Sequence, residues 1–529
     1  MSIKCSRNIL IIGNHPISHD ITSQYENAGR MVTCCDSLDS ELDINTFDEL
    51  CVLADYNADA LNADNICIRQ LSQLALRYNI AKHDEEKMRC HLLLRSNATL
   101  RLVRTVGFDK DIERCFEIYA FTLEDQWAKL VLCGLGAAKY QYPRLDRQAI
   151  SFDSDKTVRL VLTGLTDMAE CLAINAALVA HYPNYNRNNH LRTRITMIDK
   201  KIDERIDAFI GRYQHLFENS YYRMVKFHDG VPSVHTHVPM YEGHRKDFVD
   251  VEWEFVAADV HNHTIRRKLE AWTSNVNIEL SIALCNDEAT NINDAFDLPD
   301  AIYENRIPVL LYVGDDSLVR LAKADKRFGN ILPFGMPDSG YDVTQPLLKM
   351  AKMLHYFYSC GHDIPLEMQH DKVEEEWAKL ESIVNRYSNM FNVMTIPTKM
   401  HTMGHDGKEW NEYYALTQNE IETLSEVEHN RWCVERLISG WRPCTNDEKR
   451  EIHDNISEII AARKAGLPLP NDLKKFYKNN RRVHYDLRAY DELDVDATGG
   501  NVKYYDYALT ACIPLIAKSF SDKLNCHEY

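Results

Sequence analysis

Twice along the chain, a short apolar run ends at a glycine, continues into a helical pattern, and is followed by a second apolar run that ends at an aspartate. The first copy begins with the run 9–12 before Gly13 and ends at Asp36. The second begins with the run 158–163 before Gly164 and ends at Asp199. Short apolar runs that alternate with helices are typical of buried parallel strands. The sequence therefore predicts an α/β fold with tandem, doubly wound parallel sheets.

A chain of 529 residues is too long for a single core, so we expect several units. The two α/β units should cover about residues 1–150 and 151–345, the second with an insertion of helical and irregular character at about 201–250. Apolar residues at helical spacing indicate a helical connector over 346–404. A small, mainly α unit should follow over 405–529, and its first helix should begin at the capping-box sequence Thr417–Glu420.

In both α/β units, the turn after the first strand directs backbone N–H groups toward an anion, and the acid after the second strand can accept ribose hydroxyls. The candidate nucleotide-binding residues are Gly13, His15, Ser18 and Asp36 in the first unit and Gly164, Thr166, Ala169, Asp199 and Asp259 in the second. The glycine fingerprint is incomplete in both, so a sheet that binds nothing is the alternative. We expect the second unit, with its smaller turn, to bind NAD or an adenine nucleotide better than the first.

The order of runs in the second unit resembles the N-terminal nucleotide-binding domain of the Trk and RCK regulators of potassium uptake. The resemblance is carried by residues 158–199, 255–259, 282–286 and 307–311. It implies a Rossmann-like domain that binds NAD(H) or an adenine nucleotide. In that family, such domains gate a membrane partner.

Four short motifs near the C-terminus form one pattern: 426–432 with the letters EVEHNRW, 440–442 with GWR, 484–487 with HYDL, and 490–493 with YDEL. This pattern resembles the RyR domain, a small helical module that is repeated in ryanodine receptors and occurs singly in bacterial proteins. The resemblance covers about 100 residues, within the ordinary size of a domain. It implies a mainly α RyR-like domain, here with an insertion at about 451–480.

The candidate ligand-binding residues of this unit are Glu428, His429, Arg431, Trp432, Trp441, Tyr490 and Asp491. Glu428, Arg431 and Trp432 are three and four residues apart, so they share one helix face. An indole beside a guanidinium suits a phosphorylated planar ligand. The alternative is a structural charge network in which Glu428 or Asp491 pairs with Arg431 and the tryptophans belong to the core.

Charge and composition limit the classes of partner. The formal net charge of −18 argues against a nucleic-acid partner, because phosphate binding needs a basic surface. We expect no membrane insertion, since no uninterrupted apolar run reaches about 18 residues. The cysteines follow no framework spacing, which is typical of reduced thiols in the cytoplasm. Incomplete ligand patterns around the histidine pairs predict no metal.

These features favour a regulatory or sensor protein that responds to a nucleotide. The α/β units would bind the nucleotide, and the C-terminal unit would bind a second small ligand or a protein partner. We expect a homodimer. One alternative is a nucleotide-processing enzyme with its active site between the α/β units; whether the chain has any catalytic activity stays open. Another is an antiviral-defence effector that is switched by a nucleotide messenger.

Overall fold

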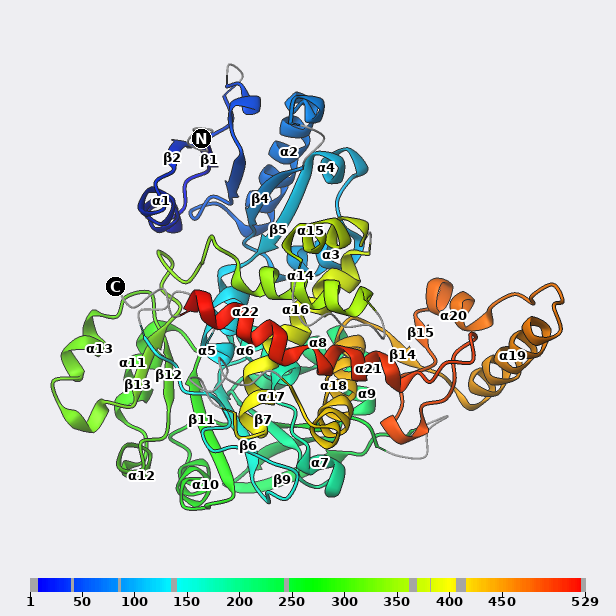
Figure 1. The fold of residues 1–529 in the computed structure, drawn as a ribbon. Helices are drawn as coiled ribbons and strands as arrows, with labels where there is room; N and C mark the ends of the chain where they lie inside the picture. Colours follow the sequence, from blue (N-terminus) through cyan, green and yellow to red (C-terminus); the bar gives the residue numbers. More distant parts are fainter. Residues whose placement is uncertain are drawn as a thin grey trace.

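The computed structural model describes residues 8–39, 42–83, 87–134, 140–241, 247–360, 369–380, 382–405 and 415–524. Over these residues the chain forms an α/β fold with two parallel-stranded sheets, followed by a mainly α C-terminal unit (Figure 1). The α/β fold class predicted from the sequence is therefore confirmed. None of the helices described here combines the length and apolarity that a membrane crossing requires.

The first sheet contains five parallel strands in the order β2-β1-β3-β4-β5. The strands are β1 (Asn8–Ile12), β2 (Met31–Cys35), β3 (Glu49–Leu53), β4 (Met88–Leu93) and β5 (Phe116–Phe121). Alternate residues of β1 enter different cores: Ile9 and Ile11 on one face, Leu10 and Ile12 on the other. Helix α1 (Ile17–Asn27) covers the first face and α2 (Ala60–Arg77) the second, so helices lie on both faces of this sheet.

The second sheet contains eight strands in the order β13-β12-β11-β6-β7-β10-β8-β9. The strands are β6 (Thr157–Thr163), β7 (Thr193–Ile198), β8 (Tyr222–His228), β9 (Val231–His237), β10 (Val251–Val256), β11 (Ile278–Leu284), β12 (Val309–Tyr312) and β13 (Ile331–Phe334). All neighbouring pairs are parallel except β8 with β9. The strand order changes direction between β6 and β11.

The insertion at 201–250 differs from the expectation. It contains α8 (Ile202–Arg212), α9 (Gln214–Asn219) and the antiparallel hairpin β8–β9, which extends the sheet beyond β10. The expectation of helical and irregular structure is therefore wrong for the hairpin. Asp229 and Gly230 adopt positive φ values of 50° and 79° at its tip. An Asp-Gly pair favours such a tight turn, and this was the available signal.

Helix α5 (Leu123–Cys133) joins the two α/β units. It follows the first sheet but packs against α6 (Asp167–Val179) of the second unit. The Trp127 indole donates a hydrogen bond of 3.2 Å to the Met336 carbonyl. The other helices of the α/β units are α3 (Asn97–Val106), α4 (Lys110–Cys115), α7 (Asn184–Arg187), α10 (His263–Thr273), α11 (Glu288–Phe296), α12 (Asp300–Glu304) and α13 (Ser317–Ala322).

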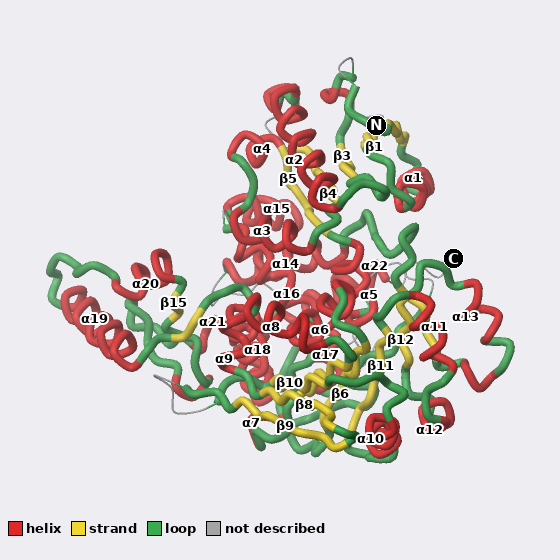
Figure 2. The backbone as a smooth tube through the Cα atoms, turned by 180° about the vertical axis from the view of Figure 1, so that it is seen from behind, coloured by secondary structure: helices red, strands yellow, loops and turns green. Residues whose placement is uncertain are grey.

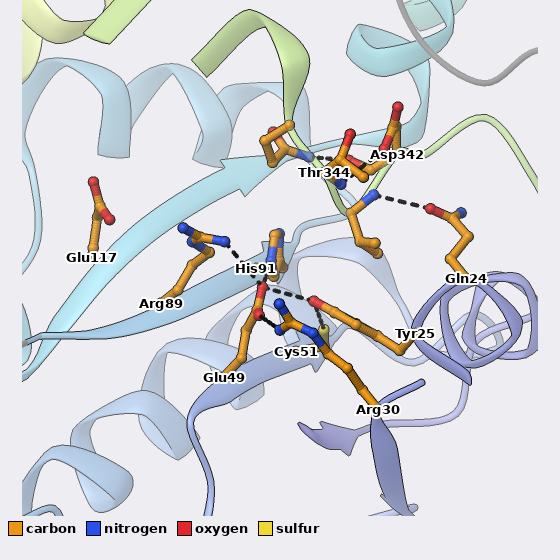
Figure 3. A network of polar contacts seen from close by, with 12 residues as sticks. Gln24, Tyr25, Arg30, Glu49, Cys51, Arg89, His91, Glu117, Asp342 and Thr344 are labelled. Atoms are coloured by element: carbon orange, nitrogen blue, oxygen red, sulfur yellow. Dashed lines mark hydrogen bonds and ion pairs between the residues drawn. The ribbon is translucent and has the colours of Figure 1, made fainter. Parts of the chain in front are cut away.

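A buried polar latch also holds the first sheet to the chain that follows β13. The Gln24 side chain donates to the Tyr341 carbonyl at 2.7 Å and accepts from the Val343 N–H at 3.1 Å. Below them, His91 contacts the Tyr341 hydroxyl at 2.5 Å and the Glu49 carboxylate at 2.7 Å. Figure 3 shows Gln24, Glu49 and His91 of the first unit converging on this segment.

Helix α16 is the central element of the connector. It packs against α3 of the first unit, α6 of the second, α14 of the connector and α18 of the C-terminal unit. The connector helices are α14 (Pro346–Ser359), α15 (His370–Lys379), α16 (Ile383–Met394) and α17 (Ile396–Thr402). Helix α16 therefore contacts a helix of each of the other three units.

The C-terminal unit contains α18 (Gln418–Ile438), α19 (Asn446–Lys464), α20 (Leu473–Arg481), α21 (Lys503–Ala511) and α22 (Ile513–Leu524), with a short parallel pair β14 (Arg442–Pro443) and β15 (Val483–His484). Helix α18 begins at the predicted capping box, in which Thr417 and Glu420 bond each other's backbone. It ends before Gly440, whose φ of 81° turns the chain away. Helices α19 and α20 project from the body in both views (Figure 1, Figure 2).

Candidate ligand-binding sites

The acids predicted to bind ribose in the second unit are already bonded. The Asp199 carboxylate accepts hydrogen bonds from the N–H groups of Leu165 at 2.8 Å and Lys201 at 2.7 Å. Asp259 pairs with Lys200. A ribose at this position would therefore have to displace or share bonds that the protein makes to itself.

The turn between β6 and α6 is closed in the same way. Gly164 has a φ of 80°, and a Cβ at this position would lie 2.5 Å from the Asn286 side-chain oxygen. The positive φ and this close approach together favour glycine. The Thr166 hydroxyl accepts from the Ala169 N–H at 3.3 Å and caps α6. The first turn of α6 also carries Asp167, whose negative charge disfavours an anion there.

The corresponding turn of the first unit is compact. Gly13 has a φ of 120°, and a Cβ there would lie 2.0 Å from the Leu53 carbonyl oxygen. The His15 ring accepts from the Ile17 N–H at 3.2 Å, and the Ser18 N–H donates to the His15 carbonyl. Burial, together with the Arg95 charge, lowers the pKa of His15 to about 4, so its ring is neutral at pH 7. Asp36 is exposed at the end of β2.

A cavity of about 270 Å³, here named the edge cavity, lies between the carboxyl ends of the two sheets. It is lined by His15, Tyr56 and Arg95 of the first unit, by Glu124 of α5, and by Met168, Glu288, Tyr312, Gly314 and Gly335 of the second. Among the predicted nucleotide-binding residues, His15 alone lines this cavity. The Arg95 guanidinium lies over the Tyr56 ring, 5.2 Å from its centroid.

A second cavity, the C-terminal cleft, has a volume of about 440 Å³ and lies between the connector and the C-terminal unit. Four of the predicted ligand-binding residues line it: Glu428, His429, Arg431 and Trp432. The facing wall is α16, with Asn385, Ser388, Asn389 and Asn392, and the remaining walls include Arg436, Lys474, Lys478, His484 and Asp506. The structure thus brings four of the seven predicted residues together at a cleft.

Within this cleft, Arg431 is only 1% exposed and its guanidinium is bonded to carboxylates. It donates to both oxygens of Glu428 at 2.8–3.0 Å and to Glu435 at 2.9 Å. Lys399 of α17 also contacts Glu428, at 2.6 Å. Although burial opposes it, the charges of Arg431 and Lys399 lower the pKa of Glu428 to about 2. The pairing of Glu428 with Arg431, which the structural alternative required, is therefore present.

Trp432 supplies an aromatic wall. Its ring is partly exposed and meets His484 edge-on, with the ring centroids 4.8 Å apart. The neighbouring His429 is fixed, because its Nε2 contacts the Arg488 carbonyl at 2.8 Å and its Nδ1 lies 3.3 Å from Asp506. His429 stacks on the Trp432 ring with the centroids 5.6 Å apart, and the Arg436 guanidinium lies over the ring, 5.5 Å from its centroid.

Asn392 and Arg436 are the polar groups of the cleft that the described residues leave unsatisfied. Asn392 is 1% exposed, and neither atom of its amide has a hydrogen-bond partner among the described residues. Arg436 is 8% exposed and its Nε has no hydrogen-bond partner there either; the nearest Glu435 oxygen is 3.9 Å away. Buried polar groups are normally hydrogen-bonded, so we expect a bound ligand or water to bond each of these atoms.

Sequence reasoning missed both residues. A signal for the first existed in the connector, where Asn385, Ser388, Asn389 and Asn392 lie at positions i, i+3, i+4 and i+7 and form a polar stripe on one helix face. Arg436 continues the face of Trp432 by four residues and could have been included for the same reason.

The other predicted residues lie elsewhere. Trp441 lines a different cavity, described below, and its ring centroid is 5.9 Å from that of His484. Tyr490 lines an outer groove, where the Lys503 ammonium lies 4.6 Å from its ring centroid. Asp491 is exposed. The seven predicted residues are thus divided among four surroundings.

No protein-family model matches the chain, and a search of the curated proteins finds no relative. Over the described residues, no group of three histidine, cysteine or acidic side chains is arranged to hold a metal ion. We therefore infer the ligand of the cleft from the chemistry of the side chains that line it.

Proposed function

We propose that this chain is a nucleotide-responsive sensor and that its C-terminal cleft binds an adenine nucleotide. The observation that carries the proposal is the buried, unpartnered amide of Asn392 in a cavity that also has an aromatic wall and the cations Arg436 and Lys478. A buried polar group without a partner costs about 1–3 kcal/mol. A ligand that satisfies the amide would recover this cost on binding.

The chemistry of the cleft suits each part of such a ligand. An asparagine amide can pair with the N6 donor and N7 acceptor of adenine together. The Trp432 ring offers a stacking surface, and stacking of a base on an aromatic side chain contributes about 1–3 kcal/mol. Arg436 and Lys478 supply positive charge for phosphate. A volume of about 440 Å³ is within the usual range for small-molecule sites.

The position of α16 supports a sensing role. One face of this helix lines the cleft, and the helix packs against α3, α6 and α18. Binding in the cleft would therefore bias the packing between the α/β units and the C-terminal unit. The resemblance of α18 and the motifs after it to the RyR domain also favours a ligand-binding role for this unit.

A second candidate function is nucleotide binding at the edge cavity. The order β10-β7-β6-β11-β12-β13 is that of Rossmann-type dinucleotide-binding sheets, which bind ligands outside the carboxyl ends of their strands where the order changes direction. The start of α6 reaches this cavity through Met168. The binding of NAD or an adenine nucleotide at the edge cavity is a prediction, and so is any reaction on that ligand.

Isothermal titration of the full chain with AMP, ADP, ATP and NAD tests both candidates. For the C-terminal cleft we expect Arg436→Gln to weaken binding roughly ten- to a hundredfold, because a charge-assisted hydrogen bond contributes about 1.5–3 kcal/mol. Arg481→Gln is the matched control, since the exposed Arg481 lies outside the lining of the cleft. Unchanged affinity in Arg436→Gln with a loss in His15→Ala would move the nucleotide to the edge cavity. No binding of any of the four at millimolar concentration would contradict the proposed function.

A further inference from the structure

A third cavity, the junction cavity, has a volume of about 450 Å³ and lies where the two α/β units, the connector and the C-terminal unit meet. Helix α16 forms a wall between it and the C-terminal cleft, and Lys478 lines both cavities. Val384, Tyr387 and Phe391 of α16 line the junction cavity, whereas Ser388 and Asn392 line the cleft. One amphipathic helix thus presents an apolar face to one cavity and a polar face to the other.

The walls of the junction cavity are mainly apolar and aromatic. Tyr213 and Trp441 complement the face of α16, and Ile174 and Leu178 of α6 form the floor. Such a lining favours a ligand with an apolar, ring-shaped body.

The carboxylates that line this cavity are all neutralised by the protein. Asp125 is bound by Arg104 at 2.6 Å and by Lys129 at 2.8 Å. Glu170 is bound by Arg101 at 3.1 Å, by Arg212, and by the Tyr213 hydroxyl at 2.9 Å. Glu435 is bound by Arg431 at 2.9 Å and by the Ser388 hydroxyl at 2.8 Å. No negative charge of the lining remains to repel an anion.

Two cations of the lining have no such partner. Arg482 and Lys478, both at the α20 side of the cavity, form no ion pair or side-chain hydrogen bond with any residue that the structure describes. On α6, Asn175 is 4% exposed and its side-chain oxygen has no hydrogen-bond partner over the same residues. The cavity therefore offers a buried acceptor on α6, positive charge at the α20 side, and an apolar surface.

We propose that the junction cavity is a second ligand site, for an organic anion that has an aromatic body and one carboxylate or sulfonate group. The anionic group would bind Arg482 and Lys478, and the rings would contact Trp441, Tyr387 and Phe391. Because α16 and α18 form walls of both cavities, an occupant of one changes the affinity of the other, and the effect is reciprocal. Lys478 lines both cavities, whereas Arg482 lines the junction cavity and not the cleft, so Arg482 is the cation that distinguishes the junction site.

Titration calorimetry of the full chain with 2-naphthoate tests the site, with the neutral 2-naphthol as the matched probe without charge. We expect 2-naphthoate to bind and 2-naphthol to bind at least tenfold more weakly. Arg482→Gln should weaken 2-naphthoate at least fivefold, and Leu178→Trp, which fills the floor, should abolish binding. Arg481→Gln and Asn392→Leu should leave it unchanged, because neither residue lines this cavity.

Arg482 is exposed, so Arg482→Gln is expected to fold. Its φ of 52° is no less favourable for glutamine than for arginine, so the exchange adds no backbone strain. Equal affinity for 2-naphthoate and 2-naphthol, or no effect of Arg482→Gln, would overturn the anionic assignment. Loss of binding in Asn392→Leu with none in Leu178→Trp would place the probe in the C-terminal cleft and overturn the site. Absence of 2-naphthoate binding to the folded chain would overturn it as well.

Discussion

The Arg431 guanidinium meets the Glu428 carboxylate through both carboxylate oxygens, at distances of 2.8–3.0 Å, in the interior of the C-terminal unit. Both side chains are at most 1% exposed. With Lys399 and Glu435 they form a buried network of two cations and two anions that ties the connector to α18. This network holds the wall of the cleft in place.

Arg431→Ala should therefore act on stability. It leaves two buried carboxylates with Lys399, Ser388 and the more distant Arg436 to neutralise or bond them. Removal of one partner from a buried ion pair costs about 3–5 kcal/mol. Chemical unfolding of the full chain, monitored by circular dichroism, measures this loss. The exposed Arg450, which pairs with Asp447 on the surface, supplies the control, since Arg450→Ala should cost at most about 1 kcal/mol. Equal stability of the two variants would contradict the buried network.

The latch between the α/β units predicts a pH dependence. Although burial opposes it, the hydrogen bond and charge of His91, with Arg89, lower the pKa of Glu49 to about 2. Because this pKa lies below the unfolded value, the carboxylate contributes stability above about pH 4.5 and loses the contribution as the pH falls toward 2. Glu49→Gln should thus be about 3 kcal/mol less stable than the natural chain at pH 7.

The two chains should approach each other in stability as the pH falls below about 4.5. Unfolding titrations of both chains at several pH values between 7 and 3 measure the difference. A difference in unfolding free energy that stays constant over this range would show that the Glu49 charge is not what stabilises the latch.

Substitutions of Trp432 and Trp441 distinguish which of the two cavities binds the nucleotide. Trp432→Leu removes the aromatic wall of the cleft and should weaken adenine-nucleotide binding by about 1–3 kcal/mol, roughly five- to 150-fold. Trp441→Leu is the matched control, because Trp441 lines the junction cavity instead. Titration calorimetry on both variants gives the comparison. A larger loss of nucleotide affinity in Trp441→Leu would mean that the nucleotide occupies the junction.

The sequence predicted the buried strands well and the exposed ones poorly. The runs that became β1 and β6 consist largely of branched apolar residues, because parallel strands buried on both faces need them. In β9, by contrast, six of the seven residues are exposed and the seventh is only partly buried. An exposed edge strand carries little apolar signal, so this hairpin was missed.

For the cleft, spacing along α18 was sufficient to place Glu428, Arg431 and Trp432 on one side of the helix. It was not sufficient to include Trp441, because the turn at Gly440 directs the following chain toward the other cavity. Asn392 could not be distinguished from its neighbours in the sequence. Its missing hydrogen bonds become evident only when all surrounding atoms are in place.

On the proposed function, the unsatisfied Asn392 amide is the group that bonds the nucleotide. Asn392→Leu, a change of similar size, tests this most directly when nucleotide affinity and thermal stability are measured on the same sample. Removal of a buried, unbonded polar group should leave the melting temperature of the ligand-free chain unchanged or raise it, while AMP and ATP affinity falls at least tenfold. Asn175→Leu, a matched change in the junction cavity, should leave nucleotide affinity intact. A lower melting temperature with unchanged affinity would contradict the account, because Asn392 would then be part of the scaffold and not of a site.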